Sequence, residues 1–236
     1  MPFRRPAVLL LAVGLAFAAG CSDDDSPAEP QEGELVVQAR SLQSFGVVAA
    51  QALDSQMRGD PTRYDVTFYR FYMAQDADCS SPVLLGTFDA SPITHDLLTD
   101  PRLFTVRGTP GTYECIVMRI SDVFTFVSES SFGNCVGGST YTVDTYRDGQ
   151  SGWFDVDGNP IAGSGTDASP VDNRVDVFFT TNPSAVLARG YSQFQIVPLT
   201  NGATIPGTST FVYDVTGQVI DDGMACRSAG GTYGFR

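Results

Sequence analysis

The sequence predicts an all-β protein, built as an antiparallel β-sandwich with one or two short helices. Three observations favour this class. About ten short segments rich in β-branched and aromatic residues follow one another, clusters of Gly, Pro, Asn and Ser separate them, and little of the chain shows helical periodicity. The 236 residues include 24 glycines, 14 prolines and 11% aromatic residues, a composition that suits a β-rich body.

The first twenty residues have the features of an export signal. Arg4 and Arg5 supply positive charge, and an apolar run of about a dozen residues follows, too short to span a bilayer comfortably. Small residues then precede Cys21, and this arrangement resembles the lipobox of bacterial lipoproteins, with Ala18 where that family usually has leucine. The resemblance, which covers the leader, implies that Cys21 is lipidated and becomes the N-terminus. The alternative is an ordinary secretory signal followed by an unrelated cysteine.

Residues 21–33 are predicted to be the lipidated cysteine and an acidic, disordered tether. Residues 22–33 hold five acids, two prolines and no base, so they bury too little apolar surface to fold. Ser22 directly after the cysteine resembles lipoproteins sorted to the outer membrane. The acidic run resembles lipoproteins that some Gram-negative lineages display on the cell surface. We therefore expect an outer-membrane, lipid-anchored protein, on the periplasmic face or at the cell surface.

Residues 34–236 are predicted to form a single β-sandwich domain. The predicted strands are 64–73, 83–88, 103–107, 112–127, 140–146, 152–156, 174–180, 191–198, 208–219 and 232–235. A further strand is possible from Leu35. Two short helices are expected, one over 41–53 from its apolar spacing and one over 91–99, where Ser91 is a suitable N-cap and Pro92 a suitable first residue.

The predicted strand 64–73 is apolar on both of its faces. Simple alternation places Val66, Phe68 and Tyr72 on one face, with Arg70 among them, and it places four residues on the other face: Thr67, Tyr69, Phe71 and Met73. We therefore expect a strand that is covered on both sides.

Part of the body also resembles a known group of domains. The motifs are Thr94-His95-Asp96-Leu97-Leu98, the turn Pro110-Gly111-Thr112-Tyr113, and the alternating stretch Ile116-Val117-Met118-Arg119-Ile120. They are similar to bacterial lipoprotein domains of unknown function that have a prealbumin-like β-sandwich, over residues 64–127. The resemblance implies an immunoglobulin- or prealbumin-like sandwich and offers no catalytic residue.

The charge of the chain excludes several functions. All 14 basic residues are arginine, so a Schiff-base lysine, a pyridoxal-phosphate site and a lysine-dependent phosphate loop are excluded. The leader holds two of the arginines and the tether five of the 27 acids, which leaves 22 acids and 12 arginines in the body. Such an acidic body argues against a nucleic-acid partner. Aspartate dominates the acids, which suits either a salt-adapted surface or calcium-binding loops.

Four cysteines remain in the body: Cys79, Cys115, Cys135 and Cys226. An even number in an exported protein indicates two disulfides, and three pairings are possible. A metal site is the alternative, but no Cys-x-x-Cys spacing occurs. If the strands alternate in direction, the loop holding Cys79 and the start of the Cys115 strand lie at the same end, which favours Cys79–Cys115 with Cys135–Cys226.

Two local sequences are candidates for chemistry. His95 is the only histidine and has Asp96 beside it, but the Gly-x-Ser-x-Gly motif of a serine hydrolase is absent. Asp155, Asp157 and Asn159 have the alternate spacing of a calcium loop, yet Pro160 stands where an EF-hand needs glycine and no closing glutamate follows. We therefore predict that this segment forms a turn.

Trp153 lies beside the same segment and is a candidate for stacking on a sugar ring.

The sequence thus predicts a non-catalytic lipoprotein without cofactors, in an envelope structural or binding role. Its expected partners are the membrane, through the lipid anchor, and a glycan or an envelope protein. The alternatives are a sugar- or calcium-binding module at the cell surface and a hydrolase that uses paired carboxylates.

Overall fold

A computed structural model describes residues 32–41, 57–100, 102–144, 153–154, 160–161, 174–191, 196–221, 223–228 and 232–235. Nearly all of the regular structure in the described residues is β-strand, which confirms the predicted all-β class. Its first ten strands are β1 (Gly33–Ser41), β2 (Met57–Gly59), β3 (Pro61–Ala74), β4 (Val83–Thr87), β5 (Ile93–Asp96), β6 (Arg102–Gly108), β7 (Gly111–Tyr113), β8 (Cys115–Ser121), β9 (Val123–Ser128) and β10 (Thr140–Asp144). The remaining elements are β11 (Trp153–Phe154), β12 (Pro160–Ile161), β13 (Arg174–Thr180), α1 (Pro183–Ala188), β14 (Ile196–Pro198), β15 (Ala203–Ile205), β16 (Gly207–Asp214), β17 (Val219–Asp221), β18 (Cys226–Ser228) and β19 (Thr232–Phe235).

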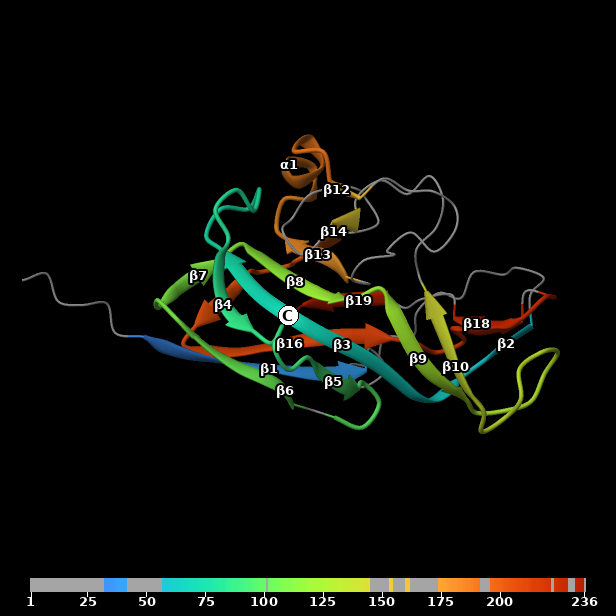
Figure 1. Ribbon diagram of the computed structural model, residues 1–236. Helices are drawn as coiled ribbons and strands as arrows, with labels where there is room; N and C mark the ends of the chain where they lie inside the picture. Colours follow the sequence, from blue (N-terminus) through green and yellow to red (C-terminus); the bar gives the residue numbers. More distant parts are fainter. Residues whose placement is uncertain are drawn as a thin grey trace, which may run out of the picture.

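Two sheets form the body (Figure 1). The smaller has the order β19-β16-β1-β6, and the larger has the order β10-β9-β3-β8-β13-β14, with β4 and β5 also paired to β3. Three minor sheets, β15-β7, β18-β17-β2 and β11-β12, complete the described strands. The side chains between the two main sheets make one continuous apolar core.

The described strand pairing is antiparallel, as predicted, with two exceptions. β1 runs parallel to β16, and β13 runs parallel to β14. Strands β13 and β14 are joined through α1, which is the crossover connection that parallel neighbours require. Strands β1 and β16 lie far apart in sequence, so no hairpin forces them to be antiparallel.

A register shift within β3 corrects the predicted faces of that strand. The shift falls between Phe68 and Arg70, where β3 pairs with β8. Before it, Val66 and Phe68 point into the core, and after it Phe71 and Met73 do. An extra residue moves all later side chains to the opposite face. The bulge therefore keeps the core apolar and turns Arg70 away from it, onto the outer face of the larger sheet.

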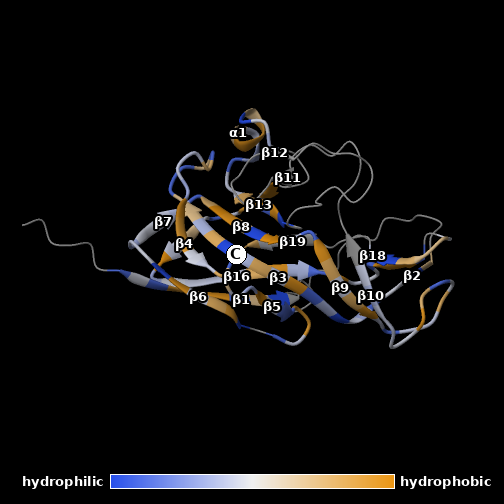
Figure 2. Cartoon of the chain, viewed as in Figure 1, coloured by the Kyte–Doolittle hydropathy of each residue, from blue (hydrophilic) through white to orange (hydrophobic). Residues whose placement is uncertain are grey.

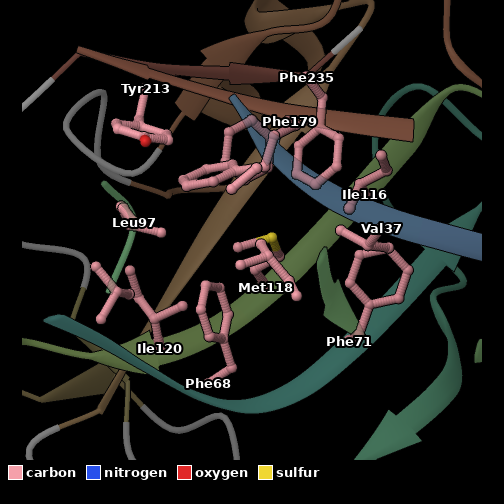
Figure 3. Close-up of a cluster of buried hydrophobic side chains, with 14 of the residues drawn as sticks. Val37, Phe68, Phe71, Leu97, Ile116, Met118, Ile120, Phe179, Tyr213 and Phe235 are labelled. Carbon is pink, nitrogen blue, oxygen red and sulfur yellow. The ribbon is translucent and has the colours of Figure 1, made fainter. Parts of the chain in front are cut away.

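Aromatic and aliphatic side chains from both sheets interlock in this core (Figure 3). Phe68 contacts Phe104 and Phe211 edge-on, with ring centroids 5.7 and 6.5 Å apart. Phe179 meets Phe235 at 4.8 Å. These edge-to-face contacts between facing sheets add to the burial of apolar area and fix how the sheets pack.

The expected helix over 91–99 is not formed. Residues 93–96 are strand β5, paired with residues 65–68 of β3, and a turn follows. The side chain of Asp96 accepts hydrogen bonds from the backbone N–H of Leu98 and from the Thr99 hydroxyl. This local bonding stabilises a turn in place of a helix, and β-branched Ile93 and Thr94 suit the sheet edge.

One helix, α1, is formed in the described residues, between the predicted strands 174–180 and 191–198, where no helix was expected. Asn182 is its N-cap, since its side chain accepts a hydrogen bond from the Ala185 N–H, and Pro183 stands in the first turn. The other expected helix, over 41–53, lies almost wholly outside the described residues; Ser41 is the last residue of β1.

The predicted strand 112–127 is broken into β7, β8 and β9. The turn before it is closed by Tyr113, whose hydroxyl donates a 2.7 Å hydrogen bond to the backbone oxygen of Thr109. A tyrosine that bonds back to the chain just upstream, two residues before a cysteine, is typical of the corner in immunoglobulin-like sandwiches.

Candidate functional site

Both disulfides expected from the strand directions are present. Cys79 is bonded to Cys115 with a Cα–Cα distance of 5.5 Å, and Cys135 is bonded to Cys226 with a Cα–Cα distance of 4.7 Å. Cys115 begins β8, and its Cα partner on β3 is Ala74, five residues before Cys79. The first disulfide therefore staples the loop after β3 to the strand beside it.

The second disulfide holds the opposite end of the body. It joins the loop between β9 and β10 to β18. Next to it the carboxylate of Asp221 accepts hydrogen bonds from Asn134 Nδ2 at 2.9 Å and from the Gly223 N–H at 3.0 Å. The two disulfides thus close both ends of the described body.

The outer face of the larger sheet carries a row of charged side chains across three strands. Arg70 on β3 has Arg119 on β8 as its Cα partner, and Arg119 has Asp176 on β13 as its other partner. Arg119 Nε and Nη2 each donate a 2.7 Å hydrogen bond to one carboxylate oxygen of Asp176. Figure 2 shows hydrophilic colouring within the mostly hydrophobic strands β3 and β8.

This ion pair is buried, with side-chain exposures of 4% for Arg119 and 11% for Asp176. Burial by itself would lower the pKa of Arg119, but the hydrogen bonds and negative charge of Asp176 outweigh it and raise that pKa above its ordinary value. Arg119 is therefore a permanent cation, and the geometry is the bidentate fork that guanidinium and carboxylate prefer.

A second set of contacts extends the row toward the sheet edge. The carboxylate of Asp89 bridges two arginines, accepting from Arg70 Nε and, at 2.8 Å, from Arg174 Nη1. The Arg174 guanidinium lies 4.0 Å from the centroid of the Tyr69 ring, a cation–π geometry. Arg70 Nη1 also donates to the Tyr72 hydroxyl at 3.3 Å. We call Tyr69, Arg70, Tyr72, Asp89, Arg119, Arg174 and Asp176 the charged layer.

The groups of the charged layer suit binding better than catalysis. Three arginines face two carboxylates, and arginine neither gives up nor takes a proton near neutral pH. Both carboxylates already accept hydrogen bonds from guanidinium groups. Within the layer Arg119 and Asp176 are buried, and the partly exposed groups are Tyr69, Arg70, Tyr72, Asp89 and Arg174.

An apolar cluster lies beside the charged layer on the same face. Val186 of α1 packs on Phe178 and Val117 and on the Cys79–Cys115 disulfide, and Tyr191 lies 4.3 Å from Phe178 between ring centroids. Helix α1 is therefore held to the sheet by this cluster and fixes one border of the layer.

His95 serves a local structural role in the described contacts. Its Nδ1 lies 3.2 Å from a carboxylate oxygen of Asp100, and its ring meets Phe68 edge-on at 6.1 Å. Asp96, which would have to orient the imidazole in a triad, instead accepts the backbone N–H of Tyr64 and of Leu98. None of the hydrogen bonds described for His95 joins it to a serine or a cysteine.

The other candidate residues are placed only in part. Trp153 lies in β11, which pairs with β12 and lies against β13, on the side of the sheet that carries α1 (Figure 2). Asp155, Asp157 and Asn159 lie outside the described residues, and so does Cys21. Within the part of the chain that the structure describes, no group of three or more His, Cys, Asp or Glu side chains is arranged to hold a metal.

The sequence analysis did not identify the charged layer. The arginines of the charged layer stand singly in mostly apolar strands, and simple alternation assigned Arg70 to the same face as Phe68. The one available signal was an arginine within each of two otherwise apolar strands, Arg70 in 64–73 and Arg119 in 116–120. Only the β3 bulge and the pairing of three distant strands bring these side chains together.

Comparisons with protein-family models, curated proteins and solved structures gave no match to this chain. None of the helices described is both long and apolar enough to span a membrane.

Proposed function

We propose that this chain is a non-catalytic β-sandwich lipoprotein, anchored in the outer membrane through Cys21, with a binding role in the cell envelope. The observation that carries the proposal is the pairing of the cysteines. The four body cysteines bond to one another, so Cys21 is the one cysteine of the chain outside both disulfides, and it stands at the end of the leader. Disulfides are typical of exported proteins, where a lipidated cysteine is also made.

The position of β1 supports this arrangement. Gly33, the start of β1, is twelve positions after Cys21, and a chain of that length reaches at most roughly 40 Å. Gly33 lies beside Gly108, the last residue of β6, at the end of the sandwich that includes β7 and the Cys79–Cys115 disulfide. That end would face the membrane, and the Cys135–Cys226 end would face away from it.

Membrane fractionation of a Cys21→Ser variant tests the proposal. Without the thiol no lipid can be attached, so we expect the variant to leave the membrane fraction or to accumulate as uncleaved precursor. Unchanged processing together with unchanged membrane retention would contradict the lipoprotein proposal. A Cys79→Ser/Cys115→Ser variant is the matched control, since it loses two cysteines, and with them one disulfide, but keeps Cys21 and should remain on the membrane.

A glycan ligand is the second candidate, and the charged layer favours it. Tyr69, Arg70 and Arg174 present phenol and guanidinium groups, and β11, which contains Trp153, lies against β13. A glycan array with the extracted protein tests this candidate. We expect binding of acidic or hydroxyl-rich glycans that falls about two- to tenfold in Trp153→Ala, since an aromatic ring contact contributes roughly 0.5–1.5 kcal/mol. An array without any bound glycan would contradict it.

A further inference from the structure

Strand β1 is held in the smaller sheet by backbone pairing on both of its edges. It is the middle strand of the smaller sheet, with seven parallel pairings to β16 on one side and six antiparallel pairings to β6 on the other. Neither disulfide involves it. One of the hydrogen bonds described for its side chains reaches a neighbouring strand: Gln38 Nε2 donates to Thr210 Oγ1 of β16 at 3.2 Å.

The side chains of β1 follow a strict inward–outward pattern. Leu35, Val37 and Ala39 are buried in the core, with exposures of 0%, 0% and 4%. Glu34 and Arg40 are exposed on the opposite face. A one-residue slip would place the apolar set in solvent, so the register of β1 is strongly specified. We call the place of β1 between β6 and β16 the β1 slot. It accepts an extended segment whose inward-facing side chains are apolar and whose outward-facing side chains are polar.

The attachment has a mechanical consequence for an anchored protein. The tether enters β1 at Gly33, so a load between membrane and body acts along this strand. Backbone hydrogen bonds to both neighbours run across the strand, so such a load acts on both ladders in shear. The covalent connection from β1 to the remaining body is the segment 42–56, beyond the far end of the strand.

We propose that the β1 slot is a binding site for residues 33–41 of this chain, which hold the disulfide-bonded body to the anchor non-covalently. The body then stays attached after the chain is cut within 42–56, and it accepts β1 as a separate peptide. The membrane part of this inference rests on the lipid anchor proposed above; the recognition of β1 by its slot does not.

The test uses the full chain with a protease site inserted after Ala50. After cleavage, the two fragments should migrate together in native size-exclusion chromatography. They are then separated in denaturant without reductant, and the body is refolded alone or with the synthetic peptide Gly33–Ser41. We expect the native circular dichroism and a 1:1 complex only with the peptide. The uncut chain, refolded in parallel, controls for the refolding step.

Two peptide variants make the test specific. Val37→Asp places a charge at a fully buried position, so we expect binding more than about a hundredfold weaker. Arg40→Asp also introduces an aspartate, but at an exposed position, and should bind within about threefold of the wild-type peptide. The inference fails if the body regains its native spectrum without peptide, if Val37→Asp binds like the wild type, or if no peptide restores a body whose uncut form refolds.

A membrane experiment separates this inference from the lipid anchor. On membranes that carry the chain with the protease site, cleavage should leave the body in the pellet, and excess Gly33–Ser41 peptide during a denaturant pulse should release it. If Cys21 has no lipid, the chain is soluble before and after cleavage, while the refolding result still decides the β1 slot. If the body leaves the membrane on cleavage alone, the slot does not hold β1 and the inference is wrong.

Discussion

Replacing Asp176 by asparagine is expected to destabilise the fold strongly. The substitution keeps the size of the side chain but removes the negative charge that receives two 2.7 Å hydrogen bonds from Arg119. Arg119 is only 4% exposed, so its cation would remain in the interior without the carboxylate that neutralises it. Breaking a buried pair by removing one partner costs about 3–5 kcal/mol, a large part of the roughly 5–15 kcal/mol that stabilises a typical domain.

Urea unfolding followed by circular dichroism, with the disulfides intact, measures this effect. For a body of this size the loss corresponds to a melting temperature lower by about 6–20 °C. The matched control is Asp65→Asn, because Asp65 pairs with Arg63 at 2.9 Å where the arginine is 58% exposed. The Asp65 side chain is 12% exposed, close to the exposure of Asp176, but the exposed Arg63 cation stays hydrated when its partner loses its charge, so the control should change little.

A double variant separates charge from packing in the same pair. Arg119→Met with Asp176→Leu removes both charges and keeps apolar volume, so it should be close to neutral or more stable than the wild type. An Asp176→Asn protein within about 1 kcal/mol of the wild type would refute the reasoning, because the Arg119 cation would then not need its partner.

Three further predictions follow from the body. Mass mapping of non-reduced protein should find no free thiol at Cys79, Cys115, Cys135 or Cys226, and opening either disulfide should cost roughly 2–4 kcal/mol; two alkylatable thiols in native material would contradict this. Burial, and after it the charge of Asp96, raises the pKa of Tyr213 to about 12. The pKa of tyrosine in the unfolded chain is about 10. The stability that neutral Tyr213 contributes should therefore be complete below pH 10 and decline between pH 10 and 12. Tyr213→Phe should remove this decline in urea unfolding curves at alkaline pH, and an identical decline in the variant would refute the prediction. Calorimetry should detect no calcium binding tighter than about 0.1 mM through Asp155, Asp157 and Asn159, the weak end of the calcium range, and a micromolar isotherm abolished by Asp157→Ala would overturn that expectation.

The sequence allowed the β-class and the disulfide pairing to be predicted because each depends on local patterns. Alternation and turn residues marked most of the strands, and the assumption that successive strands reverse direction was enough to bring Cys79 to the start of the Cys115 strand. Strand 232–235 was predicted with its observed bounds.

Features that depend on distant pairing were missed. The bulge near Tyr69 has no local sequence mark, so the faces of β3 were assigned wrongly after Phe68. The parallel pairing of β1 with β16 joins residues more than 170 positions apart, as Leu35 with Gly207 shows. The charged layer needs both the bulge and the alignment of β3, β8 and β13, so its arginines could not be grouped from their sequence positions.

Helix α1 and strand β5 show a different kind of error. Asn182 and Pro183 are a good helix start, but the short segment after them carried no clear periodicity. Ser91 and Pro92 are equally good signals, yet the Asp96 side chain bonds locally and the β3 edge pairs with Ile93–Asp96. Capping residues alone therefore do not decide between helix and edge strand.

The central claim is that Cys21 carries the lipid that anchors the body. Mass spectrometry of the N-terminal peptide from membrane-extracted wild-type protein tests it most directly. We expect a peptide that begins at Cys21 and is heavier by a diacylglycerol and an amide-linked acyl chain. A mature N-terminus at another residue, or an unmodified Cys21 thiol, would contradict it.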